Sequence, residues 1–237
     1  MLIGLFPARK SARNVSRNVC FSVASRRNGV ERFITPTAMS LLLVLVGLTL
    51  GCLREVEIAP LSATEAINHL HKLRGQCRID RRRTPAVCDE VDLRDTRAGD
   101  GDVQSLRALP EVRSVYLDGT QVTDIATIEL SELKHLKCLS LGDTAITDRG
   151  LVFLRALPQL EMLSLASTKV TDRGVAHLAE LPNLTMLNLS GTSISDASLA
   201  QLQKIKNLKE LFVTDTRISA AGVQTLKENL PNALVMH

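Results

Sequence analysis

The chain has 237 residues, which is enough for one elongated domain together with a leader segment. Hydrophobic residues make up 45% of it, but aromatic residues only 3%, with no Trp and one Tyr, which argues against a platform that stacks single-stranded nucleic acid. The formal net charge is +4, yet residues 1–38 hold seven basic side chains and one acid, so residues 39–237 carry a net charge of −2 and no nucleic-acid partner is expected.

Residues 1–52 are typical of a basic leader that ends in an export signal. The apolar stretch from Ala38 to Leu53 has 16 residues, fewer than the roughly 18 to 20 that a membrane-spanning helix needs. The segment that ends in Gly51-Cys52 resembles a bacterial lipoprotein cleavage box, although Thr49 replaces the usual Leu. This resemblance implies lipidation of Cys52 and a location in the cell envelope, on the periplasmic or outer-membrane face. A secreted protein, an uncleaved anchor and a cytosolic protein are the alternatives, and both Met1 and Met39 remain possible starts.

Residues 53–61 are interpreted as a tether and residues 62–90 as an N-terminal cap. Ser62-Ala63-Thr64-Glu65 matches a capping box that begins a helix, and Gly75 is expected to close that helix. Its apolar face is formed by Ala66, Ile67, Leu70 and Leu73. Two strands, over residues 76–80 and 87–93, are expected to form a hairpin around the Arg81–Pro85 turn.

The cysteines in this hairpin are candidates for a disulfide bond. Cys77 and Cys88 face each other if the hairpin is centred between positions 82 and 83, and export permits their oxidation. Free thiols are one alternative. A metal site is a weaker one, because the two nearby histidines are two residues apart on a helix and do not share a face: His69 and His71.

Residues 91–237 repeat a phrase every 24 residues, in six full units and a closing strand. The first apolar position is occupied in turn by Val91, Val115, Leu139, Leu163, Leu187, Leu211 and Val235. Five residues later, each full unit has a threonine: Thr96, Thr120, Thr144, Thr168, Thr192 and Thr216. A fixed period of this length is the signature of a solenoid, in which stacked units share one long core.

Each unit contains the pattern of a strand followed by the pattern of a helix. Leu139 and Leu141 alternate with other residues, as in a strand. Thr147-Asp148 is suited to cap a helix whose apolar stripe has a spacing of three: Leu151, Leu154, Leu157 and Leu160. We therefore expect one parallel strand and one short helix per unit.

The phrase Leu133-x-x-Leu136-x-x-Leu139-x-Leu141-x-x-Thr144-x-Ile146 resembles the leucine-rich repeat family. Within that family the chain is similar to bacterial helix-bearing repeats, and through them to the ribonuclease-inhibitor-like and F-box-associated repeats. It departs from the family in having Thr where Asn is usual. The resemblance implies an α/β leucine-rich repeat solenoid, a curved arc with parallel strands on its concave face and short helices on its convex face. It implies a binding module and not an enzyme.

Two polar columns accompany the repeat. The threonine column is expected to hydrogen-bond the backbone of the next unit. An aspartate column is expected to cap the helices, with a row of calcium ligands as the alternative: Asp124, Asp148, Asp172 and Asp196.

The residues that flank the buried leucines of each strand point to the concave face. Soft or aromatic side chains gather there, and they are the predicted partner-binding residues: Tyr116, Cys138, Met162, Met186, Asn188 and Phe212. Cys138 is also interpreted as a small apolar filler. The partner is expected to be a protein.

The sequence contains no recognised catalytic, phosphate-binding or metal-binding motif, so no enzyme activity, cofactor or metal is expected. The function expected is that of an exported, lipid-anchored module for protein binding. The alternatives are a structural or self-associating element of the envelope and an F-box-like adaptor. Weak self-association is expected through the edge of the closing strand, Leu234–His237.

Overall fold

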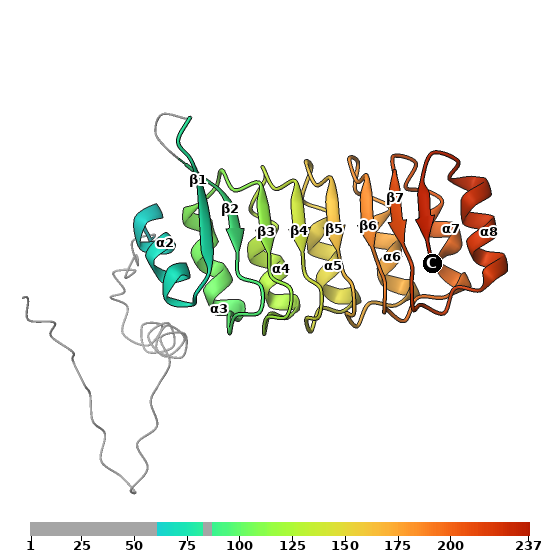
Figure 1. Cartoon of the computed structure of the whole chain (residues 1–237), viewed down its shortest axis with the longest axis horizontal. Helices are drawn as coiled ribbons and strands as arrows, with labels where there is room; N and C mark the ends of the chain where they lie inside the picture. The colour runs from blue at the N-terminus through green and yellow to red at the C-terminus, as the bar shows by residue number, and fades with distance from the viewer. Residues whose placement is uncertain (1–60, 83–86) are drawn as a thin grey trace, which may run out of the picture. The chain divides into compact units, whose positions relative to one another are not determined.

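The computed structural model describes residues 61–82 and 87–237. The predicted leader and its candidate lipidation residue Cys52 lie outside the described residues, as does the tether except for Leu61. In the described residues, eight strands form one sheet in chain order, with helices behind it (Figure 1).

The strands are β1 (Gln76–Asp80), β2 (Val87–Asp92), β3 (Ser114–Tyr116), β4 (Cys138–Ser140), β5 (Met162–Ser164), β6 (Met186–Asn188), β7 (Glu210–Phe212) and β8 (Leu234–Met236). The α-helices are α2 (Ala63–Lys72), α3 (Asp100–Val103), α4 (Asp124–Leu130), α5 (Asp148–Leu154), α6 (Asp172–Leu178), α7 (Leu199–Leu202) and α8 (Ala220–Asn229). Two 3₁₀ helices extend this set, η1 (Gln104–Ala108) and η2 (Asp196–Ser198).

The sheet is parallel from β2 to β8, and only β1 runs antiparallel, against β2. Val115 pairs with Leu139, and Leu139 pairs with Leu163, so the strand register advances by the same 24 residues as the sequence repeat. This confirms the predicted α/β solenoid. Because no unit carries an insertion, equivalent residues of successive units line up in straight columns across the sheet.

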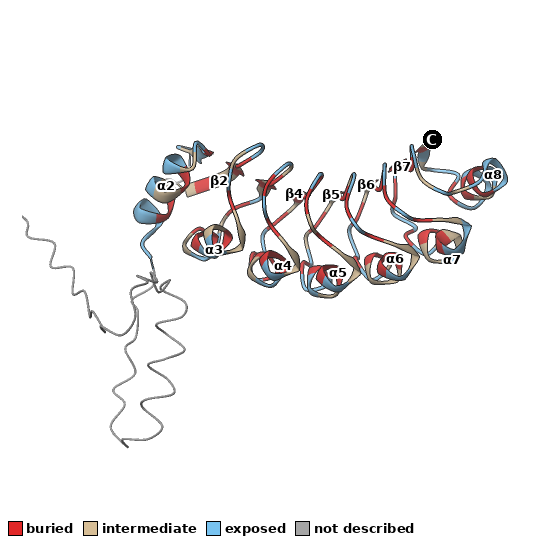
Figure 2. Ribbon diagram, turned by 90° about the horizontal axis from the view of Figure 1, so that it is seen from below, coloured by how far each residue is buried: buried red, intermediate tan, exposed pale blue. Residues whose placement is uncertain are grey.

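The core lies between the sheet and the helices along the whole row of units (Figure 2). In one central unit Leu139 from the strand and Leu141 just after it pack with Leu151 and Leu154 from the helix, and all four are almost fully buried. Each unit alone would leave one side of these leucines in water. Stacking removes that exposure, which is why the repeats are stable only together.

A threonine caps the helix on the outer side of each central unit, and an aspartate joins the units. The Thr147 side chain accepts a hydrogen bond from the Arg149 amide and so caps α5. The Asp124 carboxylate of the preceding unit accepts from the Thr147 amide at 2.7 Å and from its hydroxyl at 2.6 Å. The prediction that the aspartates cap their own helices is therefore wrong in detail: threonine is the cap, and aspartate bridges to the next unit.

The buried threonine column serves the turn inside its own unit. Thr144 Oγ1 donates to the Leu141 carbonyl at 2.6 Å, and Thr168 and Thr192 do the same three residues after their own leucines. The prediction that this column bonds the next unit is wrong, because the hydroxyl lies closer to a carbonyl of its own turn. Backbone amides link the units there, for example that of Asp143 to the Ala166 carbonyl at 2.9 Å.

The N-terminal cap has the predicted helix and hairpin. Ser62 and Glu65 form the capping box at the start of α2, and α2 ends where Arg74 adopts a left-handed backbone with φ 67°. Gly75 does not supply that conformation, contrary to the prediction. It is buried against the side chain of Leu93, where a Cβ would collide, so it permits the close approach of α2 and the sheet.

Candidate functional site

The concave face is the sheet surface formed by the strand side chains that point away from the helices. The six predicted partner-binding residues lie there in two neighbouring columns. Cys138, Met162 and Met186 pair successively in one column. The other column runs through β3 to β7 and holds Tyr116, Ser140, Ser164, Asn188 and Phe212. The strand pairing therefore brings residues separated by up to four repeats onto one surface.

The middle of the concave face is apolar and accessible. Met162 is 37% exposed, its strand neighbour Met186 is half-buried, and so is Phe212 on β7, two strands further along. The same columns continue into β8, where Leu234 is 61% exposed. Flexible thioether side chains adapt to varied apolar partners, so this region is suited to protein contact.

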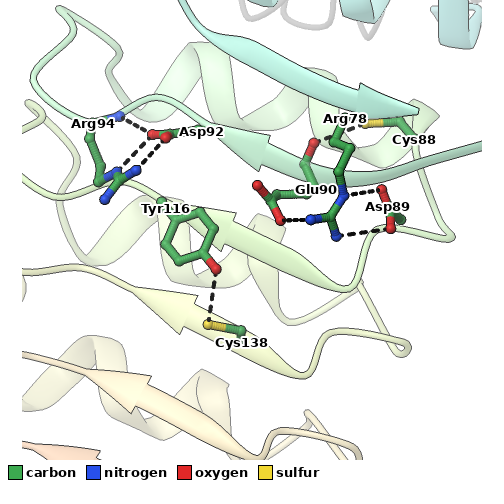
Figure 3. A network of polar contacts seen from close by, with 8 residues as sticks. All are labelled: Arg78, Cys88, Asp89, Glu90, Asp92, Arg94, Tyr116 and Cys138. Carbon is green, nitrogen blue, oxygen red and sulfur yellow. Dashed lines mark hydrogen bonds and ion pairs between the residues drawn. The ribbon is translucent and has the colours of Figure 1, made fainter. Parts of the chain in front are cut away.

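Cys138 and Tyr116 form the boundary of this apolar region. Cys138 is 8% exposed, and its thiol donates to the Tyr116 hydroxyl at 3.8 Å (Figure 3). Burial raises the pKa of the Cys138 thiol, so the reactive thiolate is disfavoured. Cys138 therefore contacts the Tyr116 hydroxyl and offers a partner little surface of its own.

The N-terminal end of the concave face carries paired charges (Figure 3). Arg78 of β1 contacts Asp89 at 3.0 Å and Glu90 at 2.8 Å. Arg94 contacts Asp92 at 2.6 Å and lies over the Tyr116 ring, 5.2 Å from its centroid. The hydrogen bonds from Arg94 lower the pKa of Asp92, so this carboxylate stays ionised to a lower pH than an ordinary aspartate.

Sequence reasoning placed part of this charged end on the concave face but did not select it as a site. Glu90, Asp92 and Arg94 occupy the column positions of the repeat phrase, and that alignment was the available signal. Arg78 carries no such signal because β1 precedes the repeats, and only the antiparallel pairing of β1 with β2 brings it to Glu90.

The two hairpin cysteines are free thiols in the structure. The predicted hairpin centre is wrong: Cys77 pairs with Val91 and Cys88 with Ile79, and the register shifts between Arg78 and Ile79. The Cys88 thiol donates to the Glu90 carbonyl at 3.3 Å, and the two thiols lie close enough that each shifts the other's pKa, downward for Cys77 and upward for Cys88. Their proximity keeps the disulfide a prediction.

The convex side also presents apolar side chains, which the sequence reasoning missed. Ile125 and Ile128 on α4 are 61% and 41% exposed, and Phe153 on α5 is 39% exposed. Nearby, Arg155 and Glu180 form an exposed ion pair at 3.1 Å. A helical spacing of three or four places such residues on the outer face, so their exposure could have been read from the sequence.

Within residues 61–82 and 87–237, no group of three or more His, Cys, Asp or Glu side chains is arranged to hold a metal ion. In the same part of the chain, no helix has the length and apolar character that crossing a membrane requires.

Comparison with known proteins finds a match to a family model described as Leucine Rich repeat at residues 132–154. No curated protein matches the chain. Among solved structures, internalin C2 from Listeria monocytogenes is 29% identical over 56% of this chain and 55% of its own, with a TM-score of 0.46. A second internalin from that organism (inlF) is 22% identical over 57% and 44%, with a TM-score of 0.44. A leucine-rich repeat protein from Leptospira interrogans is 20% identical over 56% and 39%, with a TM-score of 0.43.

The chain thus spans about half or less of the length of these proteins. The family match falls on the unit that contains Leu133, Leu136, Leu139 and Leu141, the residues of the repeat phrase. Together with the 24-residue register of the sheet, the match identifies the fold as an α/β leucine-rich repeat solenoid. Proteins of this type are typically protein-interaction modules.

Proposed function

We propose that this protein is an exported module whose concave face binds a protein partner. The observation that carries the proposal is the apolar centre of that face, where Met162 and Met186 stand side by side on paired strands and Met162 is 37% exposed. Accessible apolar surface in contact with water favours association, because burying it against a partner releases that water.

The charged N-terminal end would orient the partner. Arg78 and Arg94 are already paired with acids, so they contribute little to affinity by themselves. A partner with complementary charges could still use them to select one direction along the row of strands, while the methionines supply apolar contact. Specificity would then come from one end of the face and affinity from its middle.

Export and lipid anchoring belong to the same proposal. They are supported by the basic leader, the short apolar stretch and the Gly51-Cys52 box. A lipid on Cys52 would hold the solenoid at a membrane through the predicted tether, 53–61. The partner would then be a protein of the cell envelope, either in the same membrane or on the surface that faces it.

The proposal is tested by site-specific photo-crosslinking in the intact cell envelope. A photoreactive residue is introduced into the full chain at Met162 or Met186, and at Arg155 on the convex side as the control. We expect one shared adduct from both concave positions and none of that mass from Arg155. The same adduct from Arg155 alone would place the partner on the helices and overturn the assignment.

A matched pair of variants separates binding from folding. Met162→Glu should abolish the adduct formed from position 186, while the melting temperature changes little because the Met162 side chain is partly in water. The control exchanges the convex charges in Arg155→Glu/Glu180→Arg, which retains their ion pair and the net charge. That double variant should leave the adduct unchanged.

Self-association is the second candidate function, and the β8 edge favours it. Among the described strands, β8 pairs only with β7, and Leu234 on it is 61% exposed. Unpaired strand edges with apolar side chains attract further strands. Sedimentation of the full chain over a range of concentrations should show weak association that Leu234→Lys abolishes, whereas a strict monomer at every concentration contradicts it.

A further inference from the structure

A basic cavity lies where the N-terminal cap meets the first repeat. Its volume is about 520 Å³, and its wall is formed by the end of α2 and by the turn after β2. The lining residues are Lys72, Leu73, Arg74, Arg94, Asp95, Thr96 and Arg97. The cavity is open to solvent, since its four cationic residues are all exposed, and its volume is in the range that small molecules occupy.

Cations outnumber acids around this cavity. An adjoining hollow adds Asp92, so the charged groups are four cations and two carboxylates. Arg94 forms an ion pair with Asp92 at 2.6 Å. Lys72, Arg74 and Arg97 form no ion pair among the described residues, which leaves three cations against the single carboxylate of Asp95.

The backbone of Arg74 is a second, independent feature of the cavity. Arg74 has φ 67°, a left-handed conformation that glycine or asparagine adopts more readily at the end of a helix. Its amide donates to the His71 carbonyl, and the following residue, Gly75, donates to Leu70, as in a common helix terminus. An arginine in this conformation costs stability compared with glycine, yet it adds a cation to the wall of the cavity.

We propose that this cavity binds the phosphate group of a small phosphate-bearing molecule. Guanidinium groups match the planar spacing of phosphate oxygens and hold them with paired hydrogen bonds. A phosphate or diphosphate carries two or more negative charges, which balances the excess of unpaired cations, whereas a single carboxylate does not. The cavity is larger than one phosphate group, so the rest of the molecule has room beside it. The inference goes beyond partner binding, and its test rests on Arg74 and Arg97, which are not among the residues assigned to the concave face.

Binding is tested with pyrophosphate as the probe and the full chain, by titration calorimetry at fixed ionic strength. Acetate, a single carboxylate, serves as the comparison anion. We expect the wild-type protein to bind pyrophosphate and not acetate. Each of Arg74→Gln and Arg97→Gln should weaken binding by about tenfold, because each removes charged hydrogen bonds to the ligand.

The control keeps the change in net charge but moves it away from the cavity. Arg149 and Arg173 are exposed on the helical side, with no ion pair among the described residues. Each of the single variants Arg149→Gln and Arg173→Gln should bind pyrophosphate as the wild type does. Equal weakening by the control and the cavity variants, or no binding by the wild type, would overturn the proposal.

Arg74→Gly separates ligand binding from folding. Glycine adopts the left-handed backbone without strain, so this variant should melt at or above the wild-type temperature while binding pyrophosphate at least tenfold more weakly. Retained binding in Arg74→Gly would contradict the assignment. Pyrophosphate binding and partner binding are tested separately, because the partner-binding proposal is tested by crosslinks from Met162 and Met186. Failure of one proposal therefore leaves the other unchanged.

Discussion

Replacing Asp148 with alanine tests the bridge between units at the middle of the solenoid. The Asp148 carboxylate accepts from the Thr171 amide at 2.7 Å and from the Thr171 hydroxyl at 2.6 Å. Each hydrogen bond contributes about 1 kcal/mol in this partly buried position, and the negative charge in the first turn of α5 adds about 0.5 kcal/mol. We therefore expect Asp148→Ala to lower the free energy of unfolding by about 2–3 kcal/mol.

The assay is urea unfolding followed by circular dichroism, with Glu180→Ala as the control. Glu180→Ala also removes one negative charge, but Glu180 forms only an exposed ion pair with Arg155. This variant should therefore lower the free energy of unfolding by about 0–1 kcal/mol. Asp148→Asn keeps one acceptor oxygen, so its loss of unfolding free energy should lie between those of Asp148→Ala and Glu180→Ala. If Asp148→Ala costs no more than Glu180→Ala, the aspartate column does not hold the units together and the reasoning is refuted.

Four further predictions concern other levels of the structure. Leu163→Ala should cost about 2–5 kcal/mol in the same assay, because Leu163 is 1% exposed within the stacked core; a cost below about 0.5 kcal/mol contradicts its core position. Cys52→Ser should leave the protein in the soluble fraction or unprocessed, and mass spectrometry that finds a mature N-terminus elsewhere contradicts lipidation. Peptide mapping of the exported protein without reductant should find Cys77 bonded to Cys88, and two unmodified thiols there would exclude the disulfide. The lowered pKa of Asp92 means that its ionised form stabilises the fold above the unfolded pKa of about 3.9, and that this contribution is lost as the pH falls through the lower folded value. Melting temperatures between pH 5 and pH 2, chosen to span roughly this window, should therefore fall less in Asp92→Asn than in the wild type, and equal falls would contradict the assignment.

The candidate site was only partly readable from the sequence. The column positions of Met162, Met186 and Phe212 follow from the strand alternation, and the structure places them on one face. Cys138 was selected on the same basis, but its thiol is covered because it lies against Tyr116. Strand alternation gives the direction of a side chain and not the size of its neighbours, which depends on the strand pairing.

The basic cavity shows the same limit more strongly. Lys72 and Arg74 end a helix, whereas Arg94 and Arg97 follow a strand about twenty residues later, and no motif connects them. They meet because the buried Gly75 lets α2 approach the sheet. A contact of this kind depends on packing between segments that are distant in the sequence, and no sequence pattern predicts it.

The amino-acid sequence by itself determined the class of fold, the register of the parallel strands and the identity of the core leucines, but not the register of the β1–β2 hairpin. A period of 24 residues without insertions leaves one way to stack the units, since any slip would expose the apolar column. Only the tertiary structure decided which polar groups join the units. The Thr144 hydroxyl donates to a carbonyl of its own turn, while the Asp124 carboxylate, which only accepts, has the longer side chain and reaches Thr147 of the next unit. That choice depends on distances of a few ångströms, which exist only once the units are stacked.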